Sequence, residues 1–168
     1  MSLEIQSTTS PESPELVRNF LREHYSGVLA TADSASNPHA ATVYFSLQDD
    51  FSLLFGTKTE TQKYKNIEEN KQVAFVVYDE KEQTTIQITG HVEVIEDEDL
   101  RQKVINSMFM SSAESSAREL PPVEKLLAGD YVALRLVPMV IKMAVFARPD
   151  SEGDDLYETL LFSGQDSQ

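Results

Sequence analysis

Hydroxyl and ammonium side chains are concentrated in one short stretch of this sequence, "LLFGTKTETQKYKNIEEN" at residues 53–70. Both groups donate hydrogen bonds and the lysines add positive charge, so together they suit an anion such as a phosphate. The chain around them is acidic, with a formal net charge of −14, which makes such a cluster unusual in it. Its members are Thr57, Lys58, Thr59, Thr61, Lys63, Lys65 and, just beyond the stretch, Lys71.

The position of this cluster, between a strand and a helix, adds to its capacity for anions. An apolar run ends at Phe55, and the capping-box spacing of Thr59 and Gln62 predicts a helix that begins near Thr59 or Glu60. The first N–H groups of a helix have no partner within it, which makes them donors for a bound phosphate. Lys63, one turn in, is placed to reach that phosphate. The residues alone leave a second interpretation open, an ordinary capped helix whose lysines are solvated.

Residues for other kinds of catalysis are not visible. With six glycines in the chain, neither a G-x-G-x-x-G fingerprint nor a Walker loop is present. The absence of cysteine excludes disulfides, thiolate metal sites and thiol nucleophiles. His24, His39 and His91 lack metal-ligand spacing, and the serines of "SMFMSSAESSA" lack a G-x-S-x-G setting. If the protein is an enzyme, we therefore expect a bound organic cofactor to carry the chemistry.

Composition and charge exclude several classes of binding partner and of cellular location. A net charge of −14 argues against nucleic acid and against anionic membrane surfaces, because binding to either depends on many Lys and Arg side chains. No stretch approaches the roughly 20 apolar residues of a membrane helix. The first residues, "MSLEIQSTTSPESPE", lack the basic and apolar regions of a signal peptide, so we expect a cytoplasmic protein.

The elements that must position the cluster can be read from hydrophobic periodicity. Alternating or β-branched runs predict five strands and then one or two more in "YVALRLVPMVIKMAVF", all joined by short connections or helices. Short turns require antiparallel pairing, and closure into a barrel removes exposed edges. We therefore predict an α+β, mainly β fold: a six-stranded antiparallel β-barrel with flanking helices. The strands are expected at 27–33, 39–47, 51–57, 72–79, 84–95 and 131–146, and the helices at 13–24, 59–70 and 96–110.

The chain divides into one domain and two flanking segments. Residues 1–12 are rich in Ser, Thr, Glu and Pro and are expected to be flexible. Residues 13–148 form the predicted barrel domain. Residues 149–168 are an acidic tail. Its segment "LYETLLF" has enough apolar residues to pack against the domain, although a loose tail is an equal alternative.

The succession of these segments resembles the pyridoxamine 5′-phosphate oxidase-like family of FMN-binding split barrels. The resemblance covers roughly residues 16–110, with a weaker match in "YVALRLVP". It rests on the order and spacing of four pieces. They are "LATAD…NPHAATVYF", "LLFGTKTETQKYKNI", "NIEENKQVAFVVYD" and "ITGHVEVI".

The resemblance implies a homodimer with two FMN sites at the subunit interface and a small-molecule redox substrate. It assigns the phosphate to the start of the second helix and the flavin ring to the backbone of the second strand. The family places Arg then Lys at that helix start, where this chain has Gln62 then Lys63. The implied cofactor residues are Ala41, Thr42, Val43, Tyr44, Thr57, Lys58, Thr61, Gln62, Lys63 and Thr85.

Two departures bear on the reaction. The vitamin oxidases of this family have a carboxy-terminal Arg-x-His and a Trp after the Val-Pro step, whereas this chain reads "LVPMVIKMAVFARPDSEGDD" and has no Trp. The leading hypothesis is thus an FMN-dependent oxidoreductase of unassigned substrate. The alternatives are a noncatalytic flavin carrier or sensor, a true pyridoxamine-phosphate oxidase, and a binder of haem or a deazaflavin.

Overall fold

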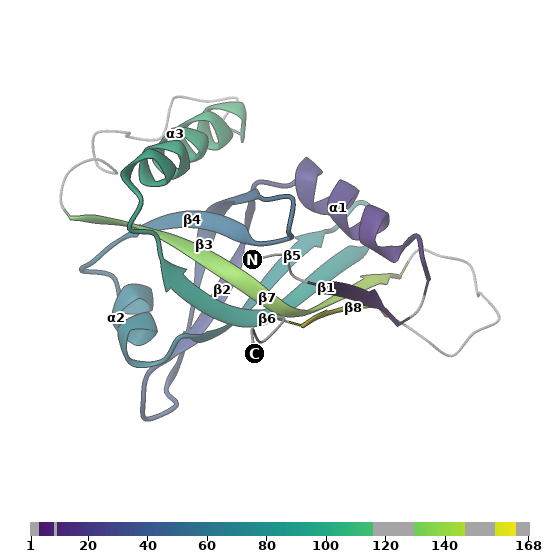
Figure 1. Cartoon of the computed structure of the whole chain (residues 1–168), viewed down its shortest axis with the longest axis horizontal. Helices are drawn as coiled ribbons and strands as arrows, with labels where there is room; N and C mark the ends of the chain where they lie inside the picture. Colours follow the sequence, from purple (N-terminus) through teal and green to yellow (C-terminus); the bar gives the residue numbers. More distant parts are fainter. Residues whose placement is uncertain (1–3, 9, 116–129, 147–156, 164–168) are drawn as a thin grey trace.

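The computed structural model describes residues 4–8, 10–115, 130–146 and 157–163, and for residues 108–115 the backbone alone. Eight strands and three helices lie in these ranges (Figure 1). In chain order they are β1 (Glu4–Ser7), α1 (Ser13–Glu23), β2 (Ser26–Ala32), β3 (Pro38–Leu47), β4 (Leu53–Lys58), α2 (Gln62–Glu69), β5 (Gln72–Asp79), β6 (Thr84–Val94), α3 (Glu98–Ser115), β7 (Tyr131–Val145) and β8 (Glu158–Ser163).

Six of the strands close into an antiparallel barrel, which confirms the predicted fold class. Their order is β7-β4-β3-β2-β5-β6, and pairing of β6 with β7 closes the ring. Strands β8 and β1 extend the sheet beyond β7, so the barrel carries a two-stranded flap. The pairs β2–β3, β3–β4 and β5–β6 are joined by short turns and must therefore be antiparallel, and the other pairings between described strands are antiparallel as well.

The barrel interior is filled by the inward-facing residues of alternating strands. In β5, Val73, Phe75 and Val77 are buried while the residues between them are exposed, the two-residue period of a strand with one face in the core. Phe75 packs edge-on against Phe45 of β3, with ring centroids 5.3 Å apart. Burial of such aromatic side chains supplies much of the driving force for folding.

The last barrel strand, β7, is a single strand of 15 residues and not two. Its pairing with β6 shifts register between Thr89 and Gly90, where Gly90 lies opposite Pro138 and Thr89 opposite Val140. The bulge accommodates a proline that cannot donate a ladder hydrogen bond. Gly90 is required there because an added Cβ would lie 2.2 Å from the carbonyl oxygen of Val137.

The helices cover separate parts of the barrel. Helix α1 buries Val17, Phe20 and Leu21 in the main core, and α3 contacts β3, β4 and β7. Helix α2 contacts β2 and β3, well separated from α1 along the long axis of the molecule (Figure 1). In the described part of the chain, none of the helices has the length and apolar content needed to span a bilayer.

The flap ties both ends of the chain to the barrel. Residues 158–163, which overlap the "LYETLLF" segment at 156–162, form β8 against β7, and Leu160 of β8 is fully buried. Strand β1 then pairs with β8. Ser13 is the first residue of α1, and its hydroxyl donates to Glu158 Oε2 at 2.5 Å.

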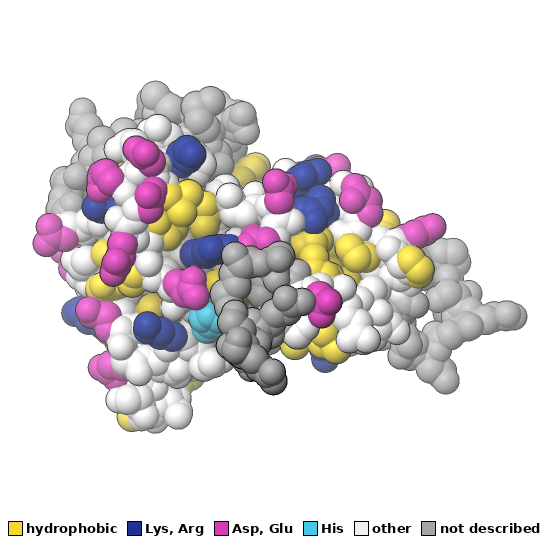
Figure 2. All heavy atoms as spheres, in the orientation of Figure 1, with side chains coloured by type: hydrophobic (Ala, Val, Ile, Leu, Met, Phe, Trp, Pro, Cys, Tyr) yellow, Lys and Arg dark blue, Asp and Glu magenta, His cyan; other side chains and the backbone are white. Residues whose placement is uncertain are grey.

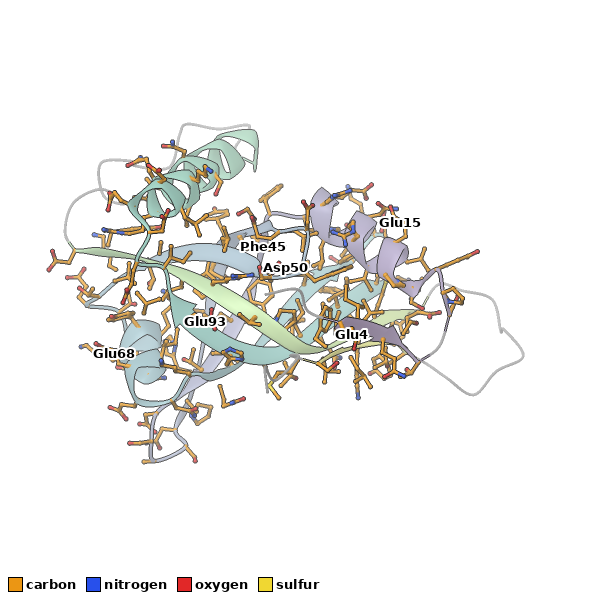
Figure 3. All side chains as sticks on the ribbon, in the orientation of Figure 1. Glu4, Glu15, Phe45, Asp50, Glu68 and Glu93 are labelled. Carbon is orange, nitrogen blue, oxygen red and sulfur yellow. The ribbon has the colours of Figure 1, made fainter. Side chains whose placement is uncertain are left out.

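A charged cluster pins the turn between β3 and β4 to β7. Asp50 accepts hydrogen bonds from the Ser52 amide (3.0 Å) and hydroxyl (2.6 Å) and pairs with Arg135 of β7 (Figure 3). Burial acts to raise the pKa of Asp50, but the hydrogen bonds from Ser52 and the charge of Arg135 outweigh it, so the pKa lies below its ordinary value.

Asp50→Asn should therefore lower the free energy of unfolding by about 1 kcal/mol at pH 7, because the neutral amide loses the attraction of Arg135. A depressed pKa stabilises the fold above the unfolded pKa of about 3.9, and this contribution is lost as pH falls through the lower folded value. Urea unfolding at pH 7 and near pH 3 should show a difference from wild type that shrinks in acid. Asp49→Asn, at the exposed neighbouring position, is the control; an equal loss there would contradict the assignment.

Candidate functional site

Helix α2 starts at Gln62 with Thr61 as its N-cap, two to three residues later than the sequence predicted. The prediction of a start near Thr59 or Glu60 is wrong because the preceding residues are held by other partners. The Thr59 amide donates to the Asp130 carbonyl at 3.1 Å, beside the start of β7. The Thr61 amide donates to Lys58 O at 3.2 Å, so the chain makes one turn before the helix.

The two threonine hydroxyls at this junction bond to each other. Thr61 Oγ1 donates to the Lys58 carbonyl at 2.8 Å, and Thr57 Oγ1 lies 3.0 Å from Thr61 Oγ1. Because the Thr61 hydrogen points to Lys58, Thr57 is the donor in the second bond. Thr57 is 5% exposed, so this pair is a largely buried support beneath the helix start.

The first turn of α2 presents free donors and a cation. The first backbone bond of the helix runs from the Lys65 amide to Thr61 O, and among the described residues no acceptor meets the amides of Gln62, Lys63 and Tyr64. Lys63 is half-buried, and burial lowers its pKa. No carboxylate in the described part of the chain lies within ion-pair distance of its ammonium group. An anion at this point would satisfy the amides and offset the cost of the buried charge.

The backbone edge of β3 next to this junction is not covered by a strand. Strand β3 pairs with β2 from Pro38 to Tyr44, but with β4 only from Phe45 to Leu47. Strands β3 and β4 therefore pair only over these three residues of β3 and diverge beside the segment Ala41–Tyr44. The edge of this segment that faces β4 has no strand partner among the described residues. Ala41 and Val43 face inward, whereas Thr42 and Tyr44 face outward.

Thr85 lies away from the start of α2 within one chain. It pairs with Tyr78 at the far end of the β5–β6 ladder, whereas Gln72, next to α2, pairs with His91. Six residues of strand separate these two pairs, a distance of roughly 20 Å. Thr85 is buried, and its hydroxyl donates to Val77 O at 3.4 Å. Nine of the ten predicted residues thus lie on β3 or at the junction of β4 and α2, and Thr85 lies on β6.

A buried amide that the sequence analysis did not single out lies beneath the helix start. Asn66 is 2% exposed and accepts a hydrogen bond from Gln62 Nε2 at 2.7 Å. Its own Nδ2 donates to Thr31 Oγ1 on β2 at 3.0 Å. The signal available in the sequence was an asparagine next to the apolar Ile67 on the inner face of a short helix, where a polar side chain is uncommon.

One face of the barrel is free of charged side chains over most of its area. The outward positions of β2, β3 and β5, and those of β6 from Thr85 to Thr89, hold no Asp, Glu, Lys or Arg, although 25% of the chain is charged; farther along β6, Glu93 is exposed. By contrast, acidic and basic side chains are scattered over the face shown in Figure 2. Val28, Val76 and Tyr78 on the uncharged face are 43%, 38% and 58% exposed. We call this the uncharged sheet face; it consists of Ser26, Val28, Ala30, Ala32, Pro38, Ala40, Thr42, Tyr44, Gln72, Ala74, Val76, Tyr78, Thr85, Gln87 and Thr89.

Solved structures of the same fold come from proteins with different ligands in their descriptions. PhzG from Burkholderia lata, solved with tetrahydrophenazine-1-carboxylic acid, is 21% identical with a TM-score of 0.61 over 95% of this chain and 98% of its own. A pyridoxamine 5′-phosphate oxidase-related, FMN-binding protein from Nostoc punctiforme is 15% identical with a TM-score of 0.58 over 90% and 96%. A haem-binding protein from Mycobacterium smegmatis is 15% identical with a TM-score of 0.66 over 85% and 58%.

These likenesses show the fold alone, and no curated protein is similar enough in sequence to count as a match. The family assignment comes from the sequence profile of pyridoxamine 5′-phosphate oxidase, which matches residues 13–142. That match spans the barrel from α1 to β7, including the junction of β4 and α2. The chain therefore belongs to the pyridoxamine 5′-phosphate oxidase family.

Proposed function

We propose that this protein binds FMN with its phosphate at the start of α2 and works as a flavin-dependent oxidoreductase. The observation that carries the proposal is a set of three amide donors beside a half-buried ammonium group at Gln62–Tyr64, none of which has a partner among the described residues. Such a set fits a phosphate, which offers three acceptor oxygens and negative charge. The FMN-binding relative from Nostoc punctiforme supports the choice of ligand.

The remaining predicted residues have distinct tasks around this phosphate. Lys63 supplies charge, and Thr57 and Thr61 hold the turn that orients the first amides of α2. Lys58 lies at the exit of β4, partly exposed and close enough in sequence to add charge. The uncovered backbone edge of Ala41–Tyr44 offers N–H and C=O groups to the polar edge of a flavin ring. When bound, FMN supplies reversible hydride and one-electron chemistry, while the protein orients it and excludes water.

We also propose that the working unit is a homodimer joined through the uncharged sheet face. A contiguous uncharged and partly apolar surface on a chain of net charge −14 is best explained by a second copy that covers it. Strand β3 contributes Ala40, Thr42 and Tyr44 to this face and its edge to the cofactor site. A site at the interface would also allow Thr85 to act from the partner subunit, where its distance within one chain no longer matters.

Haem is the ligand of one structural relative, but the histidines favour flavin. Both ring nitrogens of His24 lie near acceptors, Phe20 O at 2.6 Å and Asp79 Oδ2 at 3.2 Å. His91 Nε2 lies 3.4 Å from Glu93 Oε1. His39 has a buried Nδ1 that meets no hydrogen-bond partner in the described part of the chain, yet it lies beside Thr31 on the inward side of β3, not on an exposed cofactor surface.

The first measurement is the visible absorption spectrum of the protein. Purified protein, or apo-protein after titration, should show the flavin absorption bands and should release FMN on denaturation. Anaerobic mixing with NADH and NADPH should then bleach the flavin at a rate compatible with turnover. A colourless protein indifferent to saturating FMN would contradict flavin binding, and a stable yellow protein inert to a panel of donors would favour a carrier over an oxidoreductase.

A further inference from the structure

The buried side chain of Asn66 joins the proposed phosphate site to two barrel strands. Gln62, in the first turn of α2, donates to Asn66 Oδ1, and Asn66 Nδ2 donates to Thr31 Oγ1 of β2. Thr31 Oγ1 in turn lies 3.5 Å from the carbonyl of His39 on β3, to which it donates. The hydrogen bonds thus run from the helix start through the sheet to the strand that leads into Ala41–Tyr44.

An amide in this position costs stability unless its oxygen and nitrogen are both hydrogen-bonded. Asn66 and Thr31 are 2% and 3% exposed, and a buried amide is stabilising only when it is hydrogen-bonded. The neighbouring Ile67 is also 2% exposed and supplies apolar packing for the same helix. Apolar packing is not directional, whereas the Asn66 bonds fix the rotation of α2 about its axis.

That rotation decides where the ammonium of Lys63 lies. Lys63 is three residues before Asn66 and Gln62 is four residues before it, so both project from neighbouring positions on the helix surface. A side chain end about 6 Å from the helix axis moves by roughly 2 Å when the helix turns by about 20°. A shift of this size is enough to break a hydrogen bond between the ammonium group and a phosphate oxygen.

We propose that Asn66 is a positioning residue, which through Thr31 holds the first turn of α2 in the orientation needed for phosphate contact. This inference rests on the proposed FMN function. Asn66 does not touch the phosphate itself; it acts through Gln62, Lys63 and the helix amides.

The test compares the dissociation constants of FMN and riboflavin, which differ only by the phosphate, in wild type, Asn66→Ala and Thr31→Val. The ratio of the riboflavin constant to the FMN constant reports the phosphate contact and is insensitive to general loss of stability. We expect this ratio to fall by about three- to tenfold in both variants, the effect of one well-placed hydrogen bond. Ile67→Val is the control, because it weakens the packing of α2 without removing a hydrogen bond, and its ratio should equal that of wild type.

The outcomes separate this inference from the proposed function. A wild type that binds neither ligand overturns both. A wild type that prefers FMN, with the same ratio in Asn66→Ala and Thr31→Val, overturns the positioning role alone and leaves Asn66 as a stabilising core residue. If Asn66→Ala does not fold, Thr31→Val decides, because valine has nearly the shape of threonine and removes only the hydroxyl.

Discussion

Val76→Lys is expected to convert the proposed dimer into monomers. Val76 lies near the middle of the uncharged sheet face, paired with Val28 on one side and Gln87 on the other. In a twofold dimer each substitution occurs twice, so two ammonium groups would be buried in one interface without partners. Like charges brought together at an interface cost several kcal/mol, so we expect the dimer dissociation constant to rise about 100-fold or more.

Analytical ultracentrifugation across a range of protein concentrations measures this change directly. The side chain of Val76 is already 38% exposed in one chain, so the substitution should leave the fold of the monomer intact. Val94→Lys is the matched control: it makes the same change at a valine that is 50% exposed but lies outside the uncharged sheet face. A monomeric wild type, or equal dissociation in both variants, would contradict the proposed interface. Loss of FMN affinity together with the dimer would support a shared site.

Lys63→Ala should weaken FMN binding by about 1.5–3 kcal/mol, at least tenfold in the dissociation constant. The reason is the loss of one charge-assisted hydrogen bond to the phosphate at a half-buried position, where solvent screening is weak. Riboflavin has no phosphate, so its affinity should remain at the wild-type value. Fluorescence quenching titrations with both ligands provide the two constants.

Lys65→Ala is the control for this experiment, because Lys65 is on the same helix but is exposed. Glu68, farther along α2, projects into solvent in the same way (Figure 3). Lys63→Arg should retain most of the affinity, since it preserves the positive charge. An equal loss for Lys65→Ala would indicate a diffuse electrostatic effect, and an unchanged FMN affinity in Lys63→Ala would place the phosphate elsewhere.

The sequence predicts the barrel well because its strands have one buried face. Alternation in "QVAFVVYD" and "TTIQITGHVEVI" marks both the existence of β5 and β6 and the side of each that faces the core. The single long β7 was harder to predict, because Pro138 normally ends a strand and only the bulge opposite Gly90 allows it to continue.

The candidate site is predicted in part. Local sequence identifies the lysines and threonines near α2, but not the contact between Thr59 and Asp130 that delays the helix start, because these residues are 71 positions apart. The bonds from Asn66 to Thr31 likewise depend on how α2 is laid against β2. Such long-range contacts follow from the packed fold and have no local signature. The position of Thr85, at the far end of β5 and β6, likewise depends on strand pairing and has no local sequence signature.

The small β1 strand has a protective effect on the whole molecule. It is the outermost strand of the sheet, four residues long, with Glu4 and Gln6 exposed. The strand behind it, β8, carries Leu160, Leu161 and Phe162. Without β1, the hydrogen-bonding groups of this apolar strand would be open to strands from other molecules, the arrangement from which intermolecular β-aggregates grow. By covering the edge of β8, these few amino-terminal residues thus protect the protein from intermolecular β-aggregation.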